Sequence, residues 1–162
     1  MAELSKATIR EAHAADVDEL ARLRWQMTDE DGNVSEPLDE FRPRFAEAFG
    51  RFSVSRSWTV FVAEDDADGR LIGCLWLKRI ERVPRPNRDA VVMGYVTNVY
   101  VEPAARNRGL GSRLLAAARE LAGRERLAQL FVWPSDDAVS LYRRAGYALS
   151  RELHELELIP DL

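Results

Sequence analysis

The 162-residue sequence has little of what several functional classes require. One cysteine, Cys74, excludes an internal disulfide, and two histidines, His13 and His154, leave no Cys/His set for zinc. The apolar runs have the length of strands, and the first residues lack the long apolar core of a secretion signal. We therefore expect a cytoplasmic protein that binds no metal and has no membrane span.

Lysine is also scarce, because only Lys6 and Lys78 occur among the 23 basic residues, and the net charge is −4. A negative balance argues against a nucleic-acid surface, although arginines can still cluster locally. With 46% hydrophobic and 31% charged residues, the chain is suited to burying one core. We expect a single domain over residues 1–162 with no nucleic-acid partner, and leave a homodimer open.

The segment from Gly94 to Leu115 combines an apolar strand, a short basic loop and a helix. A strand that turns directly into a helix directs free backbone N–H groups, and the positive end of the helix dipole, at one point. Gly109 and Gly111 lack a Cβ atom and so let the backbone close around an anion, while Arg106 and Arg108 add charged donors. The spacing R-x-x-G-x-G predicts a phosphate site, with a solvated turn as the alternative.

Two better-known phosphate loops do not fit this segment. A P-loop requires a lysine directly after its last glycine, and neither Gly109 nor Gly111 is followed by one. A dinucleotide fingerprint requires a third glycine where this sequence has Leu114. Both readings are therefore excluded, and the loop is of another kind.

Periodicity predicts strands and helices along the whole chain. We expect strands at residues 7–10, 58–65, 71–80, 91–101, 127–133, 147–150 and 151–159, and helices at 16–27, 41–52, 110–123 and 135–146. Pro43 is expected to kink or restart the second helix, whose phenylalanines pack in the core. Ser135 is expected to cap the last helix, and Cys74 and His154 to be packed residues without a catalytic role.

Two side chains near the loop are candidates for function. Asn98 interrupts an otherwise apolar strand, so it either bonds to neighbouring backbone or faces a cleft. The β–loop–α–β order makes the strands before and after the third helix parallel neighbours, and ligands enter where such strands diverge. Tyr142, on the following helix, is expected beside that cleft, with a buried aromatic as the alternative.

The residues around the loop carry a family resemblance. The run VEPAARNRGLG, the amphipathic helix SRLLAAARELA and the run LFVWPSDDAVSLYRRAGY resemble the two central motifs of the GNAT superfamily of N-acetyltransferases. The likeness is specific from Tyr95 to Tyr147, and elsewhere only the order of elements is compatible. It implies a three-layer α/β (α+β) sandwich, in which a mixed, largely antiparallel sheet of six to seven strands has splayed parallel central strands. It also implies transfer of an acetyl group from acetyl-CoA to a primary amine, by direct attack and without an acyl-enzyme.

The resemblance assigns roles to residues of this sequence. The main chain of Val99, Tyr100 and Val101 would pair with the pantetheine arm, and Tyr142 would donate a proton or a hydrogen bond to the departing thiolate. The pyrophosphate would lie on the loop, at Arg106, Asn107, Arg108, Gly109, Leu110, Gly111 and Ser112. Ser135 stands where many members have an asparagine that contacts the cofactor, so its contact would be shorter or bridged by water.

The acceptor side is less defined. Family members often line it with the connection between the first two helices, which here is the acidic segment 28–36. The expected substrate residues are therefore Asn98, Asp29, Glu30 and Asp31. A cationic acceptor amine is the functional interpretation of these charges, and plain solvation is the alternative.

The general base is unassigned. The positions where some members have a carboxylate hold Tyr95 and Leu130 in this sequence. Glu102, the acidic segment and an ordered water chain stay open as candidates. Two other functions also stay open: a transferase for another acyl-CoA, and a non-catalytic acyl-CoA-binding regulatory module.

Overall fold

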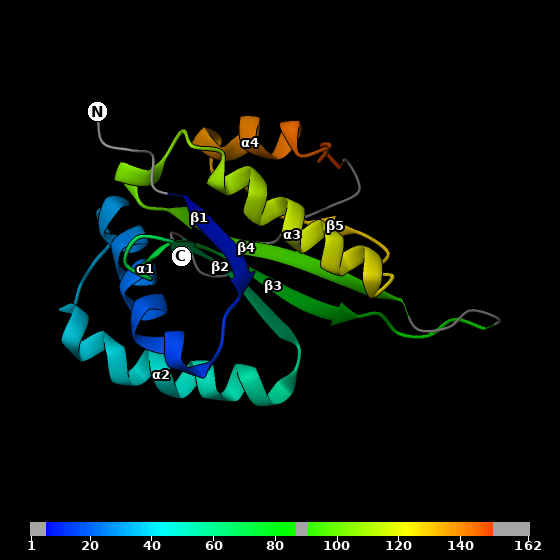
Figure 1. Cartoon of the computed structure of the whole chain (residues 1–162). Helices are drawn as coiled ribbons and strands as arrows, with labels where there is room; N and C mark the ends of the chain where they lie inside the picture. The colour runs from blue at the N-terminus through cyan, green and yellow to red at the C-terminus, as the bar shows by residue number, and fades with distance from the viewer. Residues whose placement is uncertain (1–5, 87–90, 151–162) are drawn as a thin grey trace.

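The computed structural model describes residues 6–86 and 91–150, and these form a sheet with helices on both faces (Figure 1). The strands lie in the order β1 (Ala7–Glu11), β2 (Trp58–Asp65), β3 (Leu71–Glu81), β4 (Val92–Val101) and β5 (Leu130–Phe131). The helices are α1 (Val17–Glu30), α2 (Leu38–Ser55), α3 (Leu110–Arg124) and α4 (Val139–Arg144). Because α1 and α2 cover one face and α3 and α4 the other, the expected three-layer sandwich is confirmed.

The face under α1 and α2 contains an aromatic core. The phenylalanine stripe of α2 surrounds Trp76 of β3, whose ring centroid lies 5.9, 6.0 and 6.3 Å from those of Phe45, Phe49 and Phe52. All three rings meet the indole edge-on, which is the favoured geometry for aromatic pairs. Leu20 of α1 closes the cluster and is only 1% exposed. The stripe is therefore core, as expected.

The opposite face holds an aliphatic core under α3. Helical spacing places Leu114, Leu115 and Ala118 on one side of α3, where each is at most 2% exposed. They pack with Val96 of β4 in a cluster that also includes Tyr142 of α4. This packing fixes the first turn of α3, and the loop before it, against the end of β4.

β4 bulges near its end. Its pairing with β3 shifts so that the three residues 74–76 of β3 face the four residues 97–100 of β4. Asn98 lies in this bulge with a φ of +47°, in the left-handed region that asparagine tolerates better than most residues. Its carbonyl oxygen accepts a bond from the Cys74 thiol at 3.6 Å. This contact uses the main chain of Asn98, so the two alternatives for its side chain stay open.

The parallel strands β4 and β5 separate soon after they meet. They pair only at Gly94 with Leu130 and at Tyr95 with Phe131. The close approach there requires a glycine, because a Cβ atom on Gly94 would lie 2.5 Å from the Leu130 side chain. Beyond Tyr95, the β5 side of β4 has no strand partner among the described residues. The expected splay of the central strands is confirmed.

Three strand predictions differ from the structure. The described residues form five strands rather than six to seven, and β5 spans two residues instead of 127–133, because the splay leaves the chain after Phe131 without a partner. Residues 147–150 are not a strand. The predicted strand 151–159, with His154, lies outside the described residues.

Two helix predictions are also corrected. Pro43 does not restart the second helix, since α2 is continuous from Leu38 to Ser55 around it. The acidic segment is only partly a loop, because α1 continues to Glu30. Within the described part of the chain, no helix is both long and apolar enough to cross a membrane.

Candidate active site

The loop between β4 and α3 presents a row of backbone donors. Within the described residues, the N–H groups of residues 107–112 have no hydrogen-bond acceptor, and the first bond of α3 runs from Arg113 N–H to the Gly109 oxygen. Asn107 and Gly109 both have positive φ, +61° and +74°. Left-handed residues placed so closely turn successive N–H groups toward one side, which creates an anion-binding concavity. The predicted phosphate site therefore has a suitable backbone.

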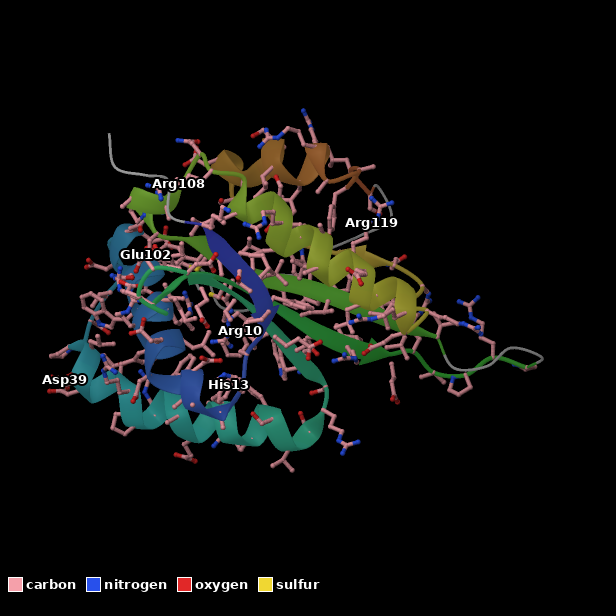
Figure 2. The ribbon with its side chains drawn as sticks, viewed as in Figure 1. Arg10, His13, Asp39, Glu102, Arg108 and Arg119 are labelled. Atoms are coloured by element: carbon pink, nitrogen blue, oxygen red, sulfur yellow. The ribbon has the colours of Figure 1, made fainter. Side chains whose placement is uncertain are left out.

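The two loop arginines are not equivalent. Arg106 donates from Nε to the Val101 oxygen at 2.9 Å and pairs through Nη2 with Glu30 of α1. Arg108 is exposed, and its guanidinium has no hydrogen bond or ion pair within residues 6–86 and 91–150. Figure 2 shows it at the loop end of α3. Arg108 is thus the cation available to a phosphate, while Arg106 fastens the loop to α1.

The other loop residues have different positions. Leu110 is 4% exposed and anchors the start of α3, while Ser112 is exposed on its first turn. A Cβ atom on Gly111 would lie 3.3 Å from Leu141 of α4, so this glycine also allows α4 to pack closely. Gly109 has open space around its missing Cβ and is required by its backbone angle alone.

The splay exposes the main chain of β4 next to the loop. Val99 and Val101 pack toward the α3 face, and Tyr100 points to the other face, where it is 5% exposed. The Tyr100 hydroxyl donates to Glu30 in α1. Only the main chain of these three residues is therefore offered to an extended ligand, which could add to β4 like a strand.

Tyr142 lies in the α3-side core below the splay. Its side chain is 6% exposed, and its hydroxyl makes no hydrogen bond within the described residues. The ring of Tyr147 meets it edge-on at a centroid distance of 5.5 Å. Burial raises the pKa of Tyr142 to about 12, and Tyr147 and Tyr95 add to the effect. Tyr142 is therefore a protonated hydrogen-bond donor at any physiological pH.

Ser135 does not act as the side-chain cap that the sequence predicts. It is the N-terminal residue of a 3-10 turn, Asp136–Ala138, with no hydrogen bond from its hydroxyl to the turn. Its carbonyl oxygen accepts the Ala138 N–H at 2.9 Å instead. The exposed hydroxyl stays available at the edge of the splay.

Glu102 is fully engaged in an ion network. Its carboxylate is buried and pairs with Arg22 of α1 and with Arg70, whose Nη1 and Nη2 lie 3.0 and 2.8 Å from its two oxygens. Both oxygens of this carboxylate are therefore occupied by guanidinium donors. Cys74 is also inert, because burial raises the pKa of its thiol to about 12. Neither residue is positioned for proton removal or nucleophilic attack.

Two of the four carboxylates of the acidic segment are paired with neighbouring side chains, and two are not. Glu30 pairs with Arg106 and accepts the Tyr100 hydroxyl, and Glu36 pairs with Arg44. Burial alone would raise the pKa of Glu30, but these two donors outweigh it and hold the pKa below its usual value. Asp29 and Asp31 are exposed and stay available. The four carboxylates do not form one cluster.

Sequence reasoning missed two features of this face. Tyr95, Phe131 and Trp133 form an aromatic group beside the splay, with ring centroids 4.9 to 5.4 Å apart, and Trp133 is 48% exposed. The alternation of Phe131 and Trp133 on one predicted strand was the available signal. Arg24 of α1, which lines a pocket between α1 and α2, was also missed, because nothing in its spacing distinguishes it from the other arginines of that helix.

Comparison with known proteins identifies the family. The model of the acetyltransferase (GNAT) domain matches residues 56–149, which include β4, the loop and α4. The chain belongs to the GNAT family.

Solved GNAT structures share the fold. A predicted acetyltransferase of Clostridium acetobutylicum, solved with acetyl-CoA, superposes with a TM-score of 0.77 at 21% identity and covers 94% of this chain and 96% of its own. A GCN5-related N-acetyltransferase from Ralstonia eutropha gives 0.73 at 24% identity, covering 93% and 98%.

Two curated relatives are longer than this chain. A mycothiol acetyltransferase of Clavibacter michiganensis is 39% identical over 85 residues, 51% of this chain and 24% of the relative. An uncharacterized protein of Mycobacterium leprae is 30% identical over 133 residues, 82% of this chain and 32% of the relative. This chain therefore spans about a quarter to a third of their length.

Proposed function

We propose that this GNAT domain transfers the acetyl group of acetyl-CoA to a primary amine. The observation that carries the proposal is the row of N–H groups at 107–112, which have no acceptor among the described residues, beside an edge of β4 that has no strand partner among them. An anion cradle next to an open strand edge suits a ligand that has a pyrophosphate at one end and an amide-containing arm at the other.

The cradle and the edge would hold acetyl-CoA. The N–H groups of residues 107–112 and the guanidinium of Arg108 bind the pyrophosphate, and Ser135 contacts the arm across the splay. The main chain of Val99 to Val101 pairs with pantetheine, and one N–H there stabilises the thioester oxygen as negative charge develops. Arg106 acts indirectly, by fastening the loop to Glu30.

Transfer proceeds by direct attack of the neutral amine. Its nitrogen forms a bond to the thioester carbon, the C–S bond breaks, and the nitrogen loses a proton. The phenol of Tyr142 donates a hydrogen bond or its proton to the departing thiolate. Since Glu102 is held by two arginines, we assign proton removal to ordered water. Asn98 is proposed to contact the acceptor beside the bulge, with Asp29 and Asp31 attracting its ammonium.

The alternative of a different acyl-CoA uses the same loop, and a comparison of acyl donors separates the two. Purified protein is given acetyl-CoA or succinyl-CoA with a panel of primary amines, and free thiol is followed. We expect thiol release that requires the amine and is faster with acetyl-CoA. Binding of acetyl-CoA without thiol release in any combination would instead support a non-catalytic acyl-CoA-binding module.

A further inference from the structure

A small pocket opens between α1 and α2, on the acceptor side of the sheet. Its cavity volume is about 160 Å³. Arg24, Trp25 and Thr28 of α1 line one wall, and Phe41 and Arg44 of α2 line the other. The connection between the two helices closes the end of the pocket, and no step of the proposed transfer uses it.

The pocket has one uncompensated charge. Arg44 pairs with Glu36, which also lines the pocket, so these two charges cancel. Arg24 is half-buried, and its guanidinium has no hydrogen bond or ion pair within residues 6–86 and 91–150. A partly desolvated guanidinium without an acid partner is unusual, because burying an unpaired charge is costly. The wall thus offers a net positive charge to an anion.

Arg24 also lies toward the reaction centre. α1, which carries Arg24, packs on β3 and β4, and the Cys74 thiol of β3 contacts the Asn98 oxygen of β4 at 3.6 Å. Asn98 forms the bulge directly before Val99, where the thioester is proposed to lie. The pocket therefore lies on the face of the sheet that α1 and α2 cover, the same face on which α1 packs against β3 and β4.

The size and walls of the pocket narrow the choice of anion. Complete small ligands occupy cavities of roughly 300 Å³ or more, so 160 Å³ fits only one end of an acceptor. Trp25, Val34 and Phe41 make much of the lining apolar. A carboxylate on a short hydrocarbon stem suits this mixture, because the guanidinium accepts the charge and the rings contact the stem.

We propose that Arg24 binds a carboxylate of the acceptor, so that the amine acetylated by this domain is one that also carries a carboxyl group. This inference rests on the proposed amine transfer and adds the chemical class of the acceptor. It is also consistent with the proposed role of Asp29 and Asp31, because such an acceptor presents an ammonium to these carboxylates and a carboxylate to Arg24.

The test uses acceptors that differ only in the carboxyl group. β-Alanine, 4-aminobutyrate and 5-aminopentanoate are each compared with the alkylamine that lacks the carboxyl, and O-phosphoethanolamine provides another anion. Thiol release from acetyl-CoA is measured for wild type, Arg24→Gln, Arg24→Lys and a control, Arg51→Gln. Arg51 lies on the exposed side of α2 and pairs with Glu47.

We expect wild type to prefer at least one carboxylated amine, and Arg24→Gln to lose roughly 10- to 100-fold in kcat/KM for it, as for one charged hydrogen bond. Arg24→Lys should recover part of the loss, and Arg51→Gln should match wild type. Equal use of carboxylated and plain amines, preference for phosphoethanolamine, or an unchanged Arg24→Gln would overturn the carboxylate site while transfer stands.

A binding experiment separates this proposal from the transfer reaction. Glutarate, a dicarboxylate without an amine, is titrated into wild type and Arg24→Gln by calorimetry. Weaker binding to Arg24→Gln supports the carboxylate site even if no amine releases thiol, in which case the proposed function alone fails. Equal binding, or no binding to either protein, overturns the site.

Discussion

The loop at 107–112 and the corner between α1 and α2 are both rich in polar groups, but they hold them differently. The loop offers main-chain N–H groups, whose direction depends on two left-handed residues, Asn107 and Gly109. The corner offers side chains, and only some of its charges are free, since Glu30 is paired with Arg106 and Glu36 with Arg44. Backbone donors keep their direction whatever their neighbours do, whereas a charge is useful to a ligand only if no neighbour neutralises it.

The largest effect is expected from removing the Tyr142 hydroxyl, which we propose assists the departing thiolate. Tyr142→Phe should lower kcat by about 10² to 10⁴, the usual loss for a positioned proton donor, with the acetyl-CoA dissociation constant unchanged. Because burial raises the Tyr142 pKa to about 12, this loss should be constant between pH 6 and 10. Steady-state rates and calorimetry measure the two quantities.

Tyr147→Phe is the matched control for this variant. The Tyr147 hydroxyl is buried without a partner in the described structure, so its removal should leave the rate and the unfolding free energy nearly unchanged. A Tyr142→Phe enzyme with full kcat would show that Tyr142 is only a core aromatic.

The second prediction tests the main-chain donors of the loop at 107–112. Gly109→Val forces a β-branched residue to a φ of +74°, where its Cβ meets open space. The loop should rearrange, with acetyl-CoA affinity falling at least about 100-fold and stability by about 1–2 kcal/mol. Gly32→Val is the control, since Gly32 has a φ of +72°, equally open surroundings and a position outside the loop. It should lose the same stability and keep its affinity.

The loop at 107–112, which offers main-chain donors, was predicted well from the sequence, and the reason is physical. A strand, two glycines and an amphipathic helix fix where N–H groups point, and all three are local properties of the chain. The parallel pairing of β4 and β5 followed from the order of elements, and their splay from the GNAT resemblance. The length of β5 could not be predicted in this way. A strand ends where its neighbour diverges, and the apolar pattern of residues 127–133 does not show where β4 and β5 separate.

The pairing of the charged side chains between α1 and α2 was much less predictable. Four carboxylates between Asp29 and Glu36 resemble a cationic-acceptor site in sequence, yet two of them are paired. The partner of Glu30 is Arg106, 76 residues away, and only the folded chain brings them together. Arg24 was missed for the opposite reason, since its importance lies in having no partner among the described residues.

The third prediction concerns the ion network of Glu102 with Arg22 and Arg70. Glu102→Gln removes the buried partner of Arg22, whose side chain is 13% exposed, and leaves the more exposed Glu19 as its remaining acidic partner. Breaking a buried pair from one side is costly, so the unfolding free energy should fall by about 3 kcal/mol. Urea unfolding measures it, and Glu125→Gln is the control, since its pair with Arg79 is more exposed and should be worth less than about 1 kcal/mol.

The same variant tests the assignment of the base. If Glu102 only holds Arg22 and Arg70 in place, kcat at a temperature where the variant is folded should stay within about threefold of wild type. A rate loss of several orders of magnitude in stably folded protein would return Glu102 to the catalytic site.

The fourth prediction examines Glu30, the contact between the loop and the corner. Its pKa is lowered in the folded state, so its contribution to stability is present above pH 4.5 and is lost as the pH falls through the lowered value. Glu30→Gln lacks this contribution at every pH. The stability difference from wild type should therefore be visible at pH 7 and shrink toward pH 3, in urea titrations at several pH values. A difference that grows on acidification would contradict the pairing with Arg106.

The smallest effect is expected from the two carboxylates that stay exposed. Asp29→Asn/Asp31→Asn should raise the acceptor KM about two- to threefold at low salt, because charges on the surface attract a cation over roughly 10 Å at 0.1 M salt and less at higher concentrations. Affinity for acetyl-CoA should not change. Glu47→Gln/Glu120→Gln removes the same charge from exposed helix positions elsewhere and should leave KM unaltered. A KM effect that is independent of salt would indicate a direct contact with the acceptor. No effect at either salt concentration would make these residues part of the solvated surface, and the charge selectivity of the corner would then depend on Arg24 alone.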